Sequence, residues 1–136
     1  MDDVLLNKAA IIERCLRRVR EEYRAAGGDL ETDQTRQDAI VLNLLRAAEA
    51  AIDGAMHMVR VRHLGVPQHS RDAFRFLEEA GLLQREASRR LQAMVGFRNI
   101  AVHDYQQIDL EILRAIIRER LSDLEAFARE LIRWAV

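Results

Sequence analysis

The sequence predicts an all-α fold in one domain, and three observations support this. The 136 residues are 49% apolar and 32% charged, a composition that allows one sizeable hydrophobic core. One proline and six glycines are too few for a turn-rich β fold. Apolar residues recur at helical spacing along most of the chain. No repeat, low-complexity tract or linker interrupts residues 1–136, which predicts a single domain.

The first predicted helix has an apolar stripe that repeats every seven residues, at Leu5, Ile12 and Val19. Gly27-Gly28 can end this helix. Cys15 is the only cysteine of the chain, so it cannot form an internal disulfide, and it lies on the apolar side of the same helix. We interpret it as a buried thiol in a reducing cytoplasm.

The second predicted helix is long. Thr32 or Asp33 can cap it, and it stops near Gly65 and Pro67. Small residues are frequent within it and would permit another helix to approach closely. Its apolar stripe comprises Ile40, Leu44, Ala48, Ala51, Ile52, Ala55 and Val59.

Three further helices are predicted. Ser70 can cap a short third helix with Gly81 at its C-terminal side, and a fourth runs from about Gln84 to the motif at residues 98–105. The last begins at about Asp109 and continues to the C-terminus. Five helices of this kind can bury their stripes together as a bundle. The third stripe comprises Phe74, Leu77 and Ala80, and the last comprises Leu113, Ile116, Ile117, Leu121, Leu124, Phe127, Leu131 and Trp134.

Positive charge is concentrated in the middle of the chain, although the whole chain has a net charge of −1. Residues 60–103 contain eight arginines against four acidic residues, a surplus of four positive charges, and three of the four histidines. The net charge argues against a general polyanion binder, and any contact with a polyanion such as RNA is expected in this positively charged segment. A set of solvated helix faces is the alternative interpretation.

No membrane segment or secretion signal is expected. No run approaches the roughly 18 apolar residues that a membrane span needs. The N-terminus opens with Asp2 and Asp3 rather than with a basic segment followed by an apolar stretch. We therefore expect a cytoplasmic protein.

Neither a metal site nor a nucleophilic serine site is predicted. His57, His63 and His69 follow one another at a spacing of six residues, which does not aim two imidazoles at one metal ion. The sequence has no HExxH pattern, no glycine-flanked serine and no phosphate-binding GxxxxGK loop. We expect no metal and no other cofactor.

The most informative segment is residues 98–105, which read Arg-Asn-Ile-Ala-Val-His-Asp-Tyr. Arg98 stays charged at any working pH and offers a planar fork of donors that suits a phosphate. Histidine titrates near neutrality, so His103 can take a proton from a ribose 2′-hydroxyl, or give one to a departing 5′-oxygen, without a metal. The pattern suggests metal-independent RNA cleavage, although a histidine near a helix end is also typical of a cap or an interface.

The run from Met94 to Tyr105 resembles the signature of HepT-like toxins in the HEPN superfamily. The likeness continues upstream through Asp38–Leu44, Ala48–Asp53 and the turn at Gly65–Gln68, so it covers most of the chain. The resemblance implies an HEPN-type helical bundle that forms a two-fold homodimer and acts as an endoribonuclease in a toxin-antitoxin pair.

The resemblance also implies roles for single residues. Arg98 and His103 would be the catalytic pair, Asn99 a supporting polar group, and Tyr105 the residue to which an MNT-type nucleotidyltransferase antitoxin attaches AMP to silence the toxin. From its chemistry alone, Tyr105 has two interpretations. It is either a structural phenol that buries its ring or a modification target that must be reachable.

Helical geometry places a condition on the catalytic pair. At 100° per residue, Arg98 and Tyr105 fall within about 20° of one face, whereas Arg98 and His103 are about 140° apart. Either the helix ends or distorts before His103, or the site combines groups from two subunits. We favour the second arrangement, which a two-fold dimer satisfies.

The sequence thus predicts an endoribonuclease toxin that cleaves RNA through the 2′-hydroxyl. One alternative is a non-catalytic helical module that docks a nucleotidyltransferase and presents or holds nucleotide. The Arg98 and His103 pair favours the nuclease, because a docking module has no need of it. A nucleic-acid-binding bundle without chemistry is a third hypothesis, which the slightly acidic net charge disfavours.

Overall fold

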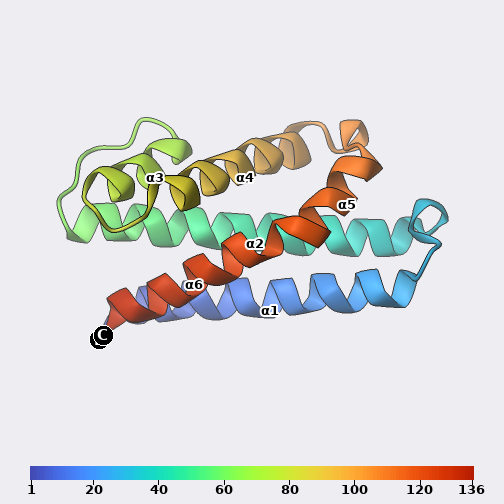
Figure 1. The fold of residues 1–136 in the computed structure, drawn as a ribbon, viewed down its shortest axis with the longest axis horizontal. Coiled ribbons are helices and arrows are strands. Elements are labelled where there is room, and N and C mark those ends of the chain that lie inside the picture. The colour runs from blue at the N-terminus through green and yellow to red at the C-terminus, as the bar shows by residue number, and fades with distance from the viewer.

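The structure is a computed structural model that describes residues 1–136, except for the side chain of Gln107. All regular structure in the described residues is helical, which confirms the predicted all-α class (Figure 1). The helices are α1 (Asp3–Ala26), α2 (Gln34–Val61), α3 (Ser70–Glu79), α4 (Arg85–His103), α5 (Leu110–Glu119) and α6 (Leu121–Ala135), with 3₁₀ turns at Leu30–Thr32 and Tyr105–Gln107.

The ends of α1 and α2 follow the predicted signals. The Asp2 carboxylate caps α1 by accepting hydrogen bonds from N–H groups of the first turn at 3.0 and 3.2 Å. Gly27 ends α1 with a φ of +59°, a backbone conformation that favours glycine. Asp33 caps α2 by accepting the N–H of Arg36 at 3.1 Å, and α2 ends at Val61, slightly earlier than predicted.

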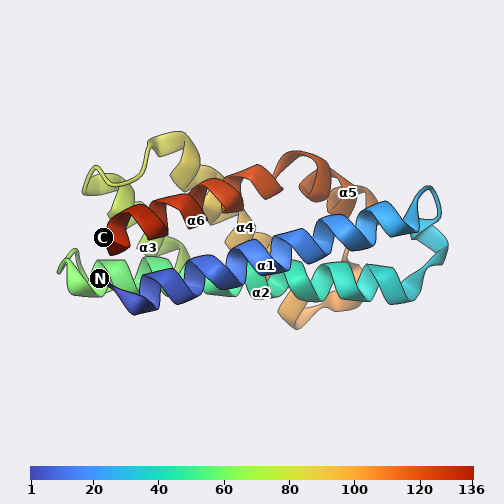
Figure 2. The same cartoon turned by 90° about the horizontal axis from the view of Figure 1, so that it is seen from below.

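Helix α2 is the centre of the bundle and contacts α1, α3, α4 and α6. Helices α1 and α4 lie on opposite sides of α2, and both run antiparallel to it (Figure 1). Helix α6 contacts α1 and α2 and runs obliquely to both in the view of Figure 1, and Figure 2 shows it displaced to one side of both helices. The two chain ends meet at one end of the bundle, where the Asp2 N–H donates to the Ala135 carbonyl at 2.8 Å.

The predicted apolar stripes form one core. Nearly every stripe residue of α1, α2, α5 and α6 is buried. Phe127 of α6 packs edge-on against Phe74 of α3 and Trp134, with ring centroids 5.4 and 5.8 Å apart. Residues remote in sequence therefore share one core, as a bundle requires.

The small residues of α2 permit close packing, as predicted. A Cβ added at Gly54 would lie 2.9 Å from Cδ1 of Leu131, so α6 approaches α2 closely at this point. Cys15 is buried as predicted, and burial raises the pKa of its thiol. No helix of the described residues is long and apolar enough to span a bilayer.

Three local predictions are wrong. The last predicted helix is two helices, because the backbone turns at Arg120, where φ is −115°. The bend lets α6 pack on α1 and α2 while α5 lies beside the last turns of α4. Ser70 is the first residue of α3 and not its cap, a position that His69 occupies. Ala80 follows the end of α3 and is exposed instead of belonging to its buried stripe.

Candidate active site

The motif occupies the last turns of α4 and the segment just beyond them. The helix is regular through His103, and the backbone leaves it at Asp104, where φ is −152° and ψ is 64°. Tyr105 then begins a 3₁₀ turn. Arg98 is partly buried, whereas Asn99 and His103 are exposed. The residues of the motif therefore lie in different environments.

Two other helices hold the guanidinium of Arg98. Its Nη1 lies 3.1 Å from Oε1 of Glu49 on α2, and its Nη2 donates to Oγ of Ser70 at the start of α3 at 2.9 Å. The side chain is only 19% exposed, and Nε is buried without a partner among the described residues. These contacts fix the plane of the fork and engage two of the five N–H donors of arginine, which leaves donors for a phosphate.

Asn99 and His103 share one exposed face of α4. Their spacing of four residues places them about 40° apart around the helix and one turn apart along it, and both side chains are exposed. A substrate can therefore reach the amide and the imidazole together.

The regular helix removes one of the two routes by which Arg98 and His103 could converge. Helix α4 is regular through His103, so the alternative in which it ends or distorts before that residue does not hold. The two residues are therefore about 140° apart and about 7.5 Å apart along the axis. Arg98 faces α2 and α3, and His103 faces solvent. The arrangement across two subunits is the route that remains.

Tyr105 is 39% exposed, and its hydroxyl donates a hydrogen bond to Oδ1 of Asp38 near the start of α2. The same carboxylate oxygen accepts Nε2 of Gln34 at 2.7 Å. Partial burial and the neighbouring carboxylate raise the pKa of Tyr105 to about 12, because both disfavour a phenolate. The hydrogen bonds from Tyr105 and Gln34 lower the pKa of Asp38. The phenol stands at a cavity of about 430 Å³.

The expectation that Tyr105 lies on the Arg98 side of one helix is wrong. That expectation assumed that α4 continues past His103, but the chain turns at Asp104. The Tyr105 hydroxyl bonds Asp38, whereas Arg98 pairs with Glu49. Those two carboxylates are eleven residues apart, about 16 Å along α2. Within one chain, the phenol oxygen and the guanidinium are therefore held at separate places on α2.

Sequence reasoning did not find the partners that α2 and α3 supply. Asp38 and Glu49 are remote from the motif in sequence, and the pattern at Ser70 predicts a helix cap. One signal was available: the eleven-residue spacing puts Asp38 and Glu49 within about 20° of one face of α2. Both carboxylates bind motif residues, so this face of α2 is the one against α4.

Comparisons with known proteins bear on this site. A family model described as ribonuclease HepT-like matches residues 12–131. The mRNA nuclease HepT of Shewanella oneidensis is 44% identical over 127 residues, which are 93% of this chain and 95% of that protein.

The fold is also similar to solved toxin structures. The tri-AMPylated HEPN toxin of Shewanella oneidensis, in complex with its MNT antitoxin, matches with a TM-score of 0.91 and 42% identity over 98% of this chain and 99% of that one. A toxin-antitoxin structure with AMP-PNP matches with a TM-score of 0.90 and 41% identity over 96% of this chain and 99% of that one.

Proposed function

The chain belongs to the HepT-like ribonuclease family, and we propose that it is a metal-independent endoribonuclease toxin of a toxin-antitoxin system. The observation that carries this proposal is the intact motif on α4, with Arg98 fixed by Glu49 and Ser70 and His103 open to substrate. The 44% identity to an mRNA nuclease extends over 93% of the chain, so it covers the motif and the helices that hold it. We propose that the protein acts in the cytoplasm.

In the proposed reaction, a ribose 2′-hydroxyl of RNA attacks the adjacent phosphorus. The P–O bond to the next nucleotide breaks, leaving a 2′,3′-cyclic phosphate and a free 5′-hydroxyl. His103 takes the proton of the attacking hydroxyl or supplies one to the departing 5′-oxygen. Arg98 binds the scissile phosphate and stabilises its transition state, and Asn99 positions one of these groups. These steps use protein side chains for every proton and charge.

We propose that the active site forms between two copies of the chain. In one copy the regular α4 turns Arg98 and His103 to different sides, and a two-fold axis beside α4 would bring the second motif to the first. Exposed apolar side chains near the motif support this arrangement. Ile100 is 49% exposed, Val102 is 50% exposed, and Ile112 of α5 is 56% exposed. A second copy would remove these surfaces from water.

We propose that the partner is an MNT-type nucleotidyltransferase antitoxin and that it modifies Tyr105. The phenol oxygen would attack the α-phosphate of ATP and release pyrophosphate, losing its proton to a base. The exposed ring of Tyr105 suits this role, and so does the AMPylated toxin among the similar structures. Once modified, the phenol oxygen could no longer donate its hydrogen bond to Asp38, and the negative charge of the added phosphate would repel that carboxylate. The modified side chain would therefore turn away from Asp38 and could obstruct the RNA path.

Variants of the motif test the nuclease assignment. We expect His103→Ala and Arg98→Ala to abolish toxicity and RNA cleavage with an unchanged circular-dichroism spectrum. Loss of acid–base help alone costs about 10² to 10⁴ in rate. Cleavage should persist in the presence of a metal chelator if no metal ion takes part in the reaction. Wild-type activity in purified His103→Ala protein would refute the assignment. A protein that binds the nucleotidyltransferase but cleaves no RNA would support the docking module instead.

The composite site has its own test. The protein should sediment as a dimer at working concentration, and specific activity should fall on dilution through the dissociation range. Mixing inactive Arg98→Ala with inactive His103→Ala should restore part of the activity, because some mixed dimers then contain one complete site. An active monomer would refute the composite site.

A further inference from the structure

We propose that Arg71 is a second phosphate-binding residue for RNA, on the same side of α4 as His103. This inference rests on the proposed nuclease function and extends it to the path of the RNA strand beyond the scissile phosphate. Three observations support it: a hollow beside the motif, the guanidinium of Arg71 lying against α4, and the geometry of the helix face that His103 occupies.

The hollow lies between the start of α3 and the C-terminal half of α4. It has a volume of about 790 Å³. Segment 67–72 forms one wall and α4 the other, and Arg98 and Asn99 of the motif belong to its lining. Its hydrogen-bonding and charged residues include Gln68, His69, Arg71, Gln92, Arg98 and Asn99. The site therefore continues from the motif into a polar hollow.

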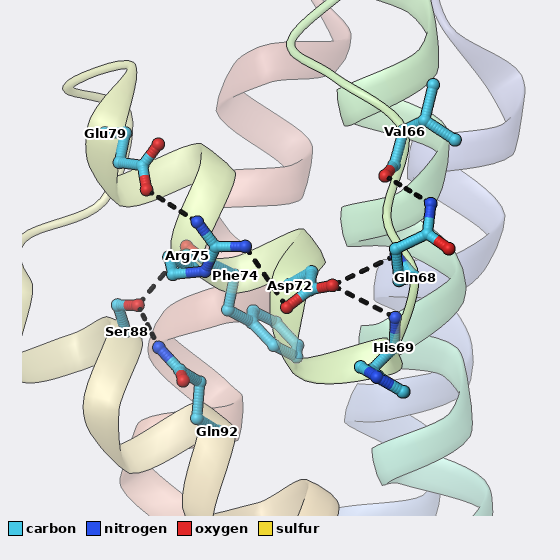
Figure 3. Close-up of polar contacts among 9 residues, drawn as sticks. All are labelled: Val66, Gln68, His69, Asp72, Phe74, Arg75, Glu79, Ser88 and Gln92. Atoms are coloured by element: carbon cyan, nitrogen blue, oxygen red, sulfur yellow. Dashed lines mark hydrogen bonds and ion pairs between the residues drawn. The ribbon is translucent and has the colours of Figure 1, made fainter.

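The wall formed by segment 67–72 is braced by hydrogen bonds (Figure 3). The Asp72 carboxylate accepts the backbone N–H groups of Gln68 and His69 at 3.0 and 3.1 Å. Arg75 bridges Asp72 and Glu79 at 3.3 and 2.9 Å. The Asp72 carboxylate is therefore paired with Arg75 and with the N–H groups of the preceding backbone.

Arg71 differs from Arg75 because its charge is uncompensated. Its side chain is exposed and makes no ion pair with a described carboxylate, whereas Arg75 makes two. Nη2 of Arg71 lies only 2.8 Å from where a Cβ on Gly96 would be. The guanidinium thus rests against the backbone of α4 at a place where any side chain would displace it.

The position of Gly96 puts Arg71 on the His103 side of α4. Gly96 and His103 are seven residues apart, which is about 20° around the helix and about 10 Å along it. Asn99 lies between them on the same exposed side. Arg98, in contrast, is about 140° from His103. Within one chain, Arg71 is therefore a cation on the same face of α4 as His103.

This arrangement fits a single RNA strand. A strand whose scissile phosphate lies at His103 can continue along α4 past Asn99 to Arg71, where the planar fork can bind a flanking phosphate with two hydrogen bonds. The amides of the hollow can bond the edges of unpaired bases, which single strands expose. An acidic segment of the antitoxin is a different ligand for the same arginine. We favour RNA because the hollow continues directly from the catalytic residues.

The test measures binding of a short fluorescein-labelled single-stranded RNA with 2′-O-methyl groups, which lacks the attacking hydroxyl and so reports binding alone. We expect Arg71→Gln to weaken binding about tenfold, equivalent to about 1.4 kcal/mol. Losing one phosphate contact should also reduce the slope of log K against log salt by about 0.7. Arg17→Gln is the matched control, because Arg17 is exposed on α1, which lies on the opposite side of α2 from α4.

Two further variants separate position from charge. Arg71→Lys keeps the charge and should keep most of the salt dependence, while losing affinity because an ammonium cannot bind a phosphate through a planar fork. Gly96→Ala keeps Arg71 but pushes its guanidinium off α4, so it should weaken binding without any change in net charge. Thermal melting of the two Arg71 variants should match the wild type, and Gly96→Ala should melt no lower, because alanine favours a helix.

The outcomes distinguish this inference from the function on which it rests. Wild-type affinity and salt slope in Arg71→Gln, in a protein whose Arg98→Ala and His103→Ala variants lose cleavage, would overturn the role of Arg71 and leave the nuclease intact. Loss of antitoxin binding with unchanged RNA binding would overturn it in favour of a protein contact. A wild-type protein that cleaves no RNA would overturn both proposals.

Discussion

Arg98 and Tyr105 are seven residues apart in the motif, yet the structure holds them in opposite ways. Arg98 lies on a regular helix and is fixed by an ion pair to α2 and a hydrogen bond to α3. Tyr105 lies beyond the helix end, on a short 3₁₀ turn, with one hydrogen bond from an exposed hydroxyl to Asp38. The proposed catalytic cation is therefore part of the packed bundle, and the proposed modification target is not.

Under the proposed roles, this difference would let one short motif serve both catalysis and its control. A phosphate-binding group gains from being fixed before substrate arrives, because no ordering cost remains for the reaction. A modified group must reach another enzyme, and segments with few packed contacts open at low free-energy cost. Four predictions test the contrast between the fixed and the accessible end, beginning with the largest expected effect.

The largest effect is expected at the fixed end. Arg98→Lys keeps the charge. Its ammonium group cannot bind Glu49, Ser70 and a phosphate together, as the planar guanidinium can. We expect cleavage to fall by about 10² to 10³, as for loss of a preorganised transition-state donor. Initial rates on a cleavable RNA measure this, with Arg17→Lys as the control. Equal rates in Arg98→Lys and wild type would mean that only the charge of Arg98 matters.

Ser70→Ala tests whether the second anchor of Arg98 contributes to stability. It removes the acceptor of Nη2, and because Nε already lacks a described partner, the guanidinium would lose much of its hydrogen bonding. We expect the free energy of unfolding to fall by about 1 to 3 kcal/mol, measured by urea denaturation. Ser122→Ala, at an exposed serine of α6, should change it by less than about 0.5 kcal/mol. Equal effects of the two variants would show that Ser70 does not anchor Arg98.

The accessible end should tolerate the matching change. Tyr105→Phe removes only the hydroxyl that bonds Asp38, so we expect the free energy of unfolding to change by less than about 0.5 kcal/mol and RNA cleavage to persist. Intact mass after incubation with the nucleotidyltransferase and ATP should show AMP on the wild type and none on this variant. A Tyr105→Phe protein that the antitoxin still silences would mean that binding, and not the phenol, controls the toxin.

The smallest effect is spectroscopic. Burial and the Asp38 carboxylate raise the folded-state pKa of Tyr105 to about 12, above its ordinary value of about 10, so the stability linked to the protonated phenol is complete below pH 10. It is lost as the pH rises towards 12. Asp38→Asn removes the neighbouring charge, so the pKa of Tyr105 should fall. Phenolate absorbance during alkaline titration measures it, with Tyr105→Phe giving the contribution of Tyr23. An unchanged titration in Asp38→Asn would show that Asp38 does not hold the phenol.

Local sequence sufficed to predict most of the helices and their apolar stripes, because these depend on neighbours a few residues away. Gly27 can take a positive φ, Asp33 can accept the N–H groups of a first helical turn, and the apolar spacing of α1 and α2 marks their buried sides. The motif likewise supplied the proposed catalytic pair and the family. The five-residue spacing of Arg98 and His103 also predicted that one regular helix cannot bring them together.

The contacts of each motif residue depend instead on how the helices pack together. Glu49 and Ser70 meet Arg98 because α2, α3 and α4 pack together, and nothing near Arg98 in the sequence signals either partner. No glycine or proline near Arg120 predicts the bend there. The bend is explained by the different surfaces on which α5 and α6 pack. Tyr105 contacts α2 because α4 ends at His103 and the backbone turns at Asp104. Local pattern fixes where a helix presents its side chains, but long-range packing selects which partner each one meets.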